Sequence, residues 1–159
     1  MRRAQRGDPA ALDALVRELV PYVGRICGAI AMDKGDDAMQ EAMLAIVRNL
    51  GSLREPAAVR GWARRIAVRE AVRVARGGRT APVDPDVLAL GADVRDQATA
   101  VEVRAVLDSL EPEQRAVLVL RHLDGLGEHE MARALGIAPG TVKSRLSRAR
   151  AAFRARWQS

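Results

Sequence analysis

The chain has one cysteine, Cys27, and among its 159 residues it has no long run of apolar side chains. A single cysteine excludes an internal disulfide and favours a reducing compartment, which we take to be the cytoplasm. No apolar stretch approaches the roughly 20 residues that a membrane-spanning helix needs. The N-terminal residues mix Asp, Arg and Glu, unlike a signal peptide. We therefore expect a cytoplasmic protein without membrane insertion.

Aromatic residues are also scarce, at 3%, although 48% of the residues are hydrophobic. The core must therefore be built from Ala, Val and Leu, a composition that favours helices over strands. The formal net charge of +6 indicates a polyanionic partner without establishing one. We predict an all-α fold.

A stretch rich in Gly, Pro and Asp interrupts the helical pattern from Gly77 onward. Such residues are typical of a flexible linker. We predict two small helical domains, residues 1–79 and 98–159, joined by a flexible linker over residues 80–97. Basic residues are concentrated in each domain, within residues 60–79 and again within residues 141–156.

In the first domain, Asp8 and Pro9 are typical of a helix start, so we predict a helix from Pro9 to Met32. Pro21 predicts a kink or a break into two helices. Further helices are expected over Asp36–Leu50, with Gly51 as C-cap, and over Pro56–Arg76. The predicted core face of the Asp36–Leu50 helix is Met39, Met43, Ile46, Val47 and Leu50.

In the second domain, helices are predicted near residues 98–109, 112–123, 128–135 and 139–156. The last two are spaced as a helix-turn-helix. Ala132 allows the two helices to approach, and Gly136 supplies the positive φ of the turn. Ile137, Val142 and Leu146 would hold the second helix against the first.

The opposite face of the 139–156 helix combines short hydroxyl groups with long cations. This pattern suits a helix in the major groove of DNA, since Arg and Lys reach phosphates or guanine edges while Ser and Thr permit close approach. A solvated helix face would normally carry both signs of charge. The predicted DNA contacts are Thr141, Lys143, Ser144, Arg145, Ser147 and Arg148.

The 56–76 helix carries four arginines and one tryptophan within about a quarter of its circumference. An indole among guanidinium groups can stack on an exposed base while the cations hold the backbone. Trp62 also lies beside the apolar face, so it could equally be a core residue. The predicted nucleic-acid contacts are Trp62, Arg65, Arg69, Arg73 and Arg76.

The outer side of the 36–50 helix presents Asp37, Gln40, Glu41 and Leu44 at helical spacing. A leucine among carboxylates is an anchor pattern for a partner helix. An isolated exposed leucine is also common on any surface. Spacing alone does not distinguish a docking face from an ordinary surface with one exposed leucine.

In this order, these parts resemble the extracytoplasmic-function (ECF) group of RNA polymerase sigma factors, in the sigma-70 family. "GDPAALDALV" is similar to the group's region 2.1, "DDAMQEAMLAIVRNL" to region 2.2 and "GWARRIA" to regions 2.3 and 2.4. The segment "LDSLEPEQRAVLVLRHLDGLGEHEMARALGIAPGTVKSRLSRARAAFR" closely matches regions 4.1 and 4.2.

The resemblance implies a sigma factor that binds core RNA polymerase and directs promoter recognition, promoter opening and transcription initiation. It places Asp37, Gln40, Glu41 and Leu44 on the clamp helices of the largest subunit. It assigns the helix with Trp62 to the minus-10 element and the helix from Pro139 to the minus-35 element. It further implies a polymerase contact at the flap, an anti-sigma factor as partner, and an acidic linker near the RNA exit path.

Two positions depart from the group's pattern. After its "IA", the group usually has Asn and, four residues later, Asp; this chain has Arg69 and Arg73. Base contacts that depend on Asn and Asp cannot be transferred to these positions. We expect stronger binding to the DNA backbone and less selective reading of bases.

Two other functions are weighed against this one. A polymerase-independent helix-turn-helix regulator would share the C-terminal pattern but would not need the docking face. An enzyme is not indicated, because His122 and His129 have no partners at a convincing metal spacing. The glycines at 125 and 127 lack the strand–turn–helix context of a phosphate loop. No cofactor or metal is predicted.

Overall fold

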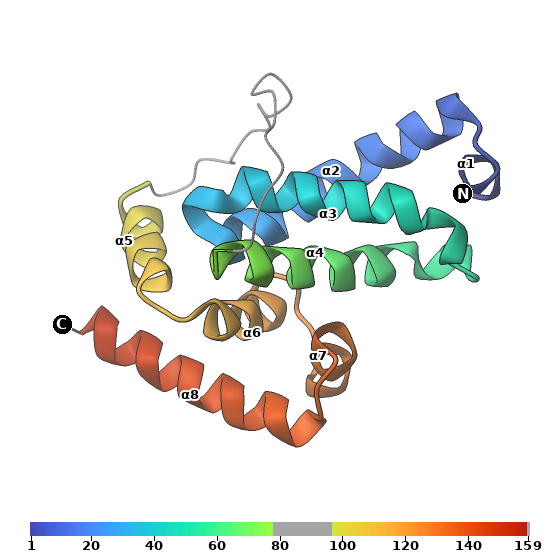
Figure 1. Ribbon diagram of the computed structural model, residues 1–159. Helices are drawn as coiled ribbons and strands as arrows, with labels where there is room; N and C mark the ends of the chain where they lie inside the picture. The colour runs from blue at the N-terminus through green and yellow to red at the C-terminus, as the bar shows by residue number, and fades with distance from the viewer. Residues whose placement is uncertain (78–96, 159) are drawn as a thin grey trace. The chain divides into compact units, whose positions relative to one another are not determined.

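The computed structural model describes residues 1–77 and 97–158, and every regular element within them is helical. The chain divides into two compact units, Met1–Val83 and Asp84–Ser159 (Figure 1). The predicted all-α fold is thereby confirmed. The predicted linker, residues 80–97, lies outside the described residues except for Gln97, which begins a helix.

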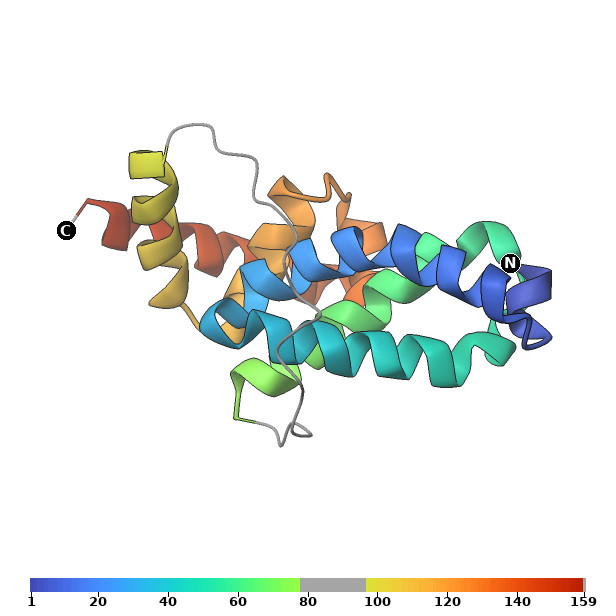
Figure 2. The ribbon, with the colours of Figure 1, turned by 90° about the horizontal axis from the view of Figure 1, so that it is seen from above.

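The N-terminal unit is built around three long helices that lie side by side (Figures 1 and 2). These are α2 (Pro9–Ala31), α3 (Gly35–Asn49) and α4 (Val59–Ala75). The shorter elements are α1 (Arg2–Gln5) and the 3₁₀ turns η1 (Met32–Lys34), η2 (Leu50–Ser52) and η3 (Pro56–Ala58).

Helix α2 begins as its sequence predicts. The Asp8 carboxylate accepts a 3.0 Å hydrogen bond from the backbone N–H of Ala11, and Pro9 is the first helical residue. Arg3 pairs with the other carboxylate oxygen at 2.7 Å. The Ala11 N–H and then the Arg3 guanidinium lower the pKa of Asp8. This cap therefore fixes the start of the helix and its short N-terminal neighbour.

Pro21 does not break α2 into two helices. Of the two predicted outcomes, a kink or a break, the break is wrong. The helix runs without interruption from Pro9 to Ala31. Pro21 and Arg17, whose carbonyl loses its i→i+4 partner, are both on the exposed side of the helix. Water can solvate that carbonyl, so the proline is tolerated.

Small residues let α2 and α3 pack closely. A Cβ added at Gly35 would lie 2.7 Å from the Cα of Gly28. The tight connection between the two helices places Met32 at a φ of 57°, the one positive φ among the described non-glycine residues. Ala38 and Ala42 of α3 are fully buried, as is Cys27 of α2. The core of this unit is therefore aliphatic and tightly spaced.

The core face of α3 is rotated from the predicted one. Ile46 is buried, but Val47 is 38% exposed and Met43 only half-buried, while alanines take the central positions. Because small residues carry little weight in a hydrophobic pattern, the larger side chains bias its predicted direction. The helix also ends at Asn49 in a 3₁₀ turn, and Gly51 does not adopt the positive φ expected of a C-cap.

The C-terminal unit contains α5 (Gln97–Asp108), α6 (Pro112–His122), α7 (Glu128–Leu135) and α8 (Pro139–Trp157). Helices α7 and α8 form the predicted helix-turn-helix. Gly136 adopts φ 67° and ψ 33° in the turn, and Ile137 donates its N–H to the Ala132 carbonyl at 3.2 Å. Val142 and Leu146 are buried where α8 contacts α6 and α7.

Two arginines hold the C-terminal end of α5. Arg115 of α6 donates to the Asp108 carbonyl at 3.2 Å, and its side chain is only 7% exposed. Arg156 of α8 donates to the Ser109 carbonyl. Cations are favourable beside the carbonyl groups at a helix C-terminus. The end of α5 is therefore tied to both α6 and α8.

We expect Gly35→Ala to destabilise the N-terminal unit by about 1–3 kcal/mol, because the added methyl group overlaps the backbone at Gly28. The measurement is urea unfolding followed by the fluorescence of Trp62 in a Trp157→Phe background. Gly61→Ala is the control, since no atom lies within 4 Å of a Cβ added there. It should raise stability by about 0.5–1 kcal/mol. Equal stability of the two variants would contradict the close approach.

Candidate nucleic-acid interface

Helix α8 presents a polar, basic face on the side opposite its buried stripe. Thr141, Lys143, Ser144, Ser147 and Arg148 are exposed, and Arg145 is half-buried beside the stripe. No acidic residue follows Glu130 in the sequence. The predicted residues of this helix therefore share one accessible, positively charged surface.

Local hydrogen bonds hold two side chains of this face against their own helix. The Ser144 hydroxyl donates to the Thr141 carbonyl at 3.1 Å, and Nε of Arg148 donates to the Ser144 carbonyl at 3.4 Å. These contacts turn the side chains back along their own helix. A partner can therefore approach the helix backbone closely, and the exposed Arg148 lies within its reach.

The first turn of α8 has no side-chain cap. Ala138 is the N-cap residue, Pro139 follows it, and no acidic residue lies in the first turn. The backbone N–H of Thr141 reaches the Ala138 carbonyl at 3.0 Å. The positive end of the helix dipole therefore has no neutralising carboxylate in its first turn, which favours an anion such as a phosphate.

Helix α4 sorts its arginines onto different sides. Arg65 and Arg69 are exposed one turn apart on the outer side, and Arg76, the C-cap residue that follows the helix, is exposed too. Trp62 is half-buried next to this line, so part of its side chain is accessible. These four residues are therefore all at least partly accessible.

Arg73 is placed differently from the other predicted arginines. Its Nε lies 2.7 Å from Oε2 of Glu70, and its Nη2 lies 3.4 Å from Oε2 of Glu41 on α3. The structure thus brings one predicted nucleic-acid contact into an ion pair with one predicted docking residue.

A second group of arginines on α4 was not predicted. Arg60 lies over the ring of Tyr22 on α2, 4.2 Å from its centroid, and Nε of Arg64 donates to the Tyr22 hydroxyl at 2.9 Å. The one-turn spacing of Arg60 and Arg64 indicates that they share one side of the helix, but the sequence could not identify Tyr22 as their partner. Tyr22 is buried, so this group also joins α2 to α4.

The outer side of α3 carries the predicted docking residues. Asp37 is exposed, Gln40 and Glu41 are half-buried, and Leu44 is 37% exposed. Val47, predicted as core, lies one turn beyond Leu44 and is equally exposed. The two side chains make an apolar pair that is larger than the single leucine predicted.

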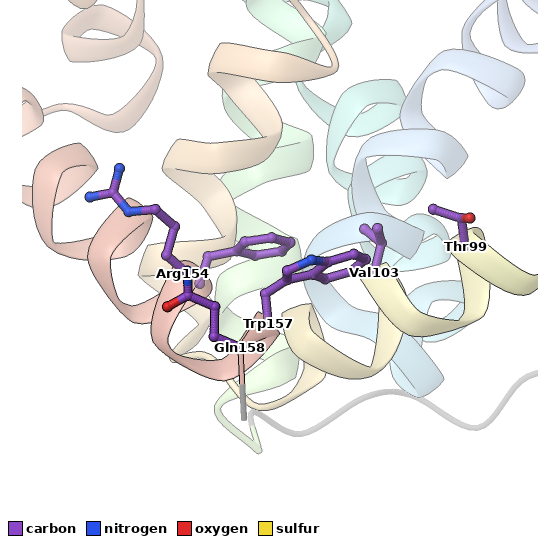
Figure 3. A pocket seen from close by; sticks show the side chains of 6 residues that line it. Thr99, Val103, Arg154, Trp157 and Gln158 are labelled. Atoms are coloured by element: carbon purple, nitrogen blue, oxygen red, sulfur yellow. The ribbon is translucent and has the colours of Figure 1, made fainter.

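An apolar groove of about 300 Å³ lies between α5 and the last turns of α8. Figure 3 shows Val103 of α5 facing the indole of Trp157, with the guanidinium of Arg154 directed away. Phe153 stacks on Trp157 at a centroid distance of 5.9 Å. Trp157 nevertheless remains 44% exposed. Sequence reasoning had not marked this groove.

Family models match both units of the chain. The model described as sigma-70 region 2 matches residues 14–80, and the model described as sigma-70, region 4 matches residues 100–153. The ECF RNA polymerase sigma factor SigM of Mycobacterium tuberculosis is 39% identical over 91% of this chain and 76% of its own length. The chain belongs to the ECF sigma factors.

Two further relatives match this sigma factor over a larger share of their own length. The ECF RNA polymerase sigma-E factor of Escherichia coli is 33% identical over 96% of this chain and 90% of its own length. The RNA polymerase sigma-H factor of Pseudomonas aeruginosa is 33% identical over 96% of this chain and 89% of its own.

Two solved structures share the fold. The sigma factor RpoE of Bartonella quintana, in complex with the anti-sigma factor NepR, aligns over 93% of this chain and 97% of its own. Its TM-score is 0.66 at 19% identity. CnrH in complex with the cytosolic domain of CnrY aligns over 97% of this chain and 92% of its own, with a TM-score of 0.65 at 23% identity.

Membership of this family makes the protein a sigma factor, which binds core RNA polymerase and promoter DNA and directs transcription initiation. The polymerase-independent regulator is not favoured, because the match includes region 2 as well as the helix-turn-helix domain. Sigma factors are regulators. In the described ranges, no helix is long and apolar enough to cross a membrane, and no three potential metal ligands cluster.

We expect Arg148→Ala to weaken promoter binding by the assembled polymerase, with a lost base contact costing about 1–3 kcal/mol. The measurement is a titration of labelled promoter DNA at several salt concentrations. If Arg148 contacts a phosphate instead, the salt dependence should fall by about one charge. Arg17→Ala, which removes an exposed charge outside the predicted set and the groove, is the control. Equal affinities for the two variants would exclude Arg148 from the DNA interface.

Proposed function

We propose that this sigma factor divides promoter recognition between its two units. Helix α8 reads the minus-35 element in the major groove through its exposed polar and basic face. Helix α4 engages the minus-10 element through Trp62 and the exposed arginines Arg65, Arg69 and Arg76. The observation that carries the proposal is the presence of a separate basic helix face on each unit.

Polymerase docking falls to the outer side of α3 in this proposal. Leu44 and Val47 supply apolar area, while Asp37, Gln40 and Glu41 surround it with polar groups. An apolar centre with a polar rim is typical of a protein interface. The clamp helices of the largest polymerase subunit are the partner that the family resemblance assigns to this face.

The apolar groove of the C-terminal unit is the surface that we assign to the flap of polymerase. Its two stacked aromatic rings are partly accessible, and large aromatic residues are the usual anchors of interfaces. Chemistry is left to the polymerase, so the protein itself would act without catalysis, in the cytoplasm where polymerase works.

An anti-sigma factor is a further proposed partner. RpoE of similar fold was solved in complex with the anti-sigma factor NepR, and CnrH with the cytosolic domain of CnrY. A protein that covers α3 or the groove would compete with polymerase for the same apolar side chains.

Run-off transcription tests the whole proposal. Core RNA polymerase from the source organism, supplemented with this protein, should initiate at discrete start sites on a promoter library, which sequencing of the transcripts would identify. Core enzyme alone is the control. If the supplemented enzyme initiates no better than core on every template, the proposed function is wrong.

Leu44→Asp should lower the affinity for core polymerase at least tenfold while leaving the fold intact, because Leu44 is partly exposed and a buried charge in the interface is costly. The measurement is binding of labelled sigma factor to core enzyme without DNA, beside a circular-dichroism melt. Ala14→Asp adds the same charge to the exposed side of α2 and is the control. Undiminished binding by Leu44→Asp would refute docking through α3.

A further inference from the structure

Glu70 is a charged residue in the core-facing part of α4, with only 9% of its surface exposed. Each of its carboxylate oxygens is held by a different arginine. Oε1 accepts from Nε of Arg69 at 3.1 Å, and Oε2 accepts from Nε of Arg73 at 2.7 Å. A buried carboxylate without such partners would be strongly destabilising.

Arg73 also contacts a second helix. Its Nη2 donates to Oε2 of Glu41 on α3 at 3.4 Å, so one guanidinium links two carboxylates from neighbouring helices. A planar guanidinium can hold two acceptors at once in fixed directions, which a lysine ammonium on its flexible stem cannot do equally well. The distance to Glu41 and the partial exposure of both groups make this link adjustable rather than rigid.

The charges of this cluster balance. Arg69 and Arg73 contribute two positive charges, and Glu41 and Glu70 contribute two negative ones. The side chain of Arg69 is 68% exposed, whereas that of Arg73 is 38% exposed. If Arg73 turned toward a DNA phosphate, Glu70 would lose its shorter ion pair inside the core. That cost opposes a direct role of Arg73 at the promoter.

We propose that Arg73 is a positioning residue for polymerase docking, which orients Glu41 on α3 while neutralising Glu70, and that it is not a promoter contact. This rests on the proposed function, in which α3 is the docking face. The arginine that replaces the group's usual aspartate would thereby act on the affinity for polymerase instead of on the reading of the minus-10 element.

The test is the affinity of the full-length protein for core polymerase in the absence of DNA. Arg73→Gln should weaken it about 5- to 30-fold, which lies within the range of coupling energies between residues of one ion network. Arg73→Lys should weaken it too, because one ammonium cannot replace both contacts. Full core affinity in Arg73→Gln, combined with reduced promoter binding by the assembled enzyme, would overturn the proposal.

Matched variants separate the two roles. Arg17→Gln removes an exposed charge from the same unit and should leave core affinity unchanged. Arg69→Gln should show the opposite pattern from Arg73→Gln, with core affinity kept and promoter binding reduced. A double-mutant cycle of Glu41→Gln and Arg73→Gln should be non-additive for core affinity. Additive effects would overturn the link between these two residues.

Glu70→Gln combined with Arg73→Gln guards against misfolding, because it removes the buried charge together with its partner. If this double variant melts like wild type yet binds core polymerase as weakly as Arg73→Gln, the loss comes from Glu41. If it restores full core affinity, the proposal is wrong. Failure of the wild-type protein to bind core polymerase would instead refute the proposed function.

Discussion

The close packing of small side chains between α2, α3 and α4 is the constraint on which the N-terminal unit depends. With few aromatic residues available, Gly28, Gly35 and buried alanines bring the helix backbones together. At such short separations, long side chains on the rims can cross from one helix to the next. Arg73 reaches α3 and Arg64 reaches α2 in this way. The aliphatic core and the interhelical bonds of the arginines therefore have one cause.

Those crossings decide which positive charges are available to a partner. A count of arginines along α4 overstates the basic surface, because several of them are engaged by Tyr22, Glu70 or Glu41. Arg69 remains largely exposed even though it bonds to Glu70. Helix α8 differs, since no carboxylate lies in its sequence. Arg148 bonds to its own helix backbone, and Arg156 bonds to the Ser109 carbonyl. Arginines of α4 thus take part in ion pairs and bonds between helices, whereas the exposed cations of α8 have no carboxylate on their own helix.

Much of this arrangement could be predicted from the sequence. Local signals were sufficient for the Asp8 cap, the positive φ of Gly136 and the buried stripe of α8, because each depends on neighbouring residues. The orientation of α3 was missed at Val47, since alanines pack deeply without contributing to a hydrophobic pattern. The bond between Glu41 and Arg73 joins residues 32 positions apart, and no spacing rule connects them. The pairing of ionisable groups across the N-terminal surface could therefore not be predicted from the sequence.

The uncapped start of α8 has a consequence for how binding and folding are linked. Serine, threonine, aspartate and asparagine are the preferred N-cap residues, because their side chains accept from the N–H groups of the first turn. Here Ala138 offers no such group. A phosphate oxygen placed at that turn would accept from its backbone N–H and so take the place of the missing side-chain cap. Ligand and secondary structure would then stabilise each other, and DNA binding would raise the stability of the helix that reads it.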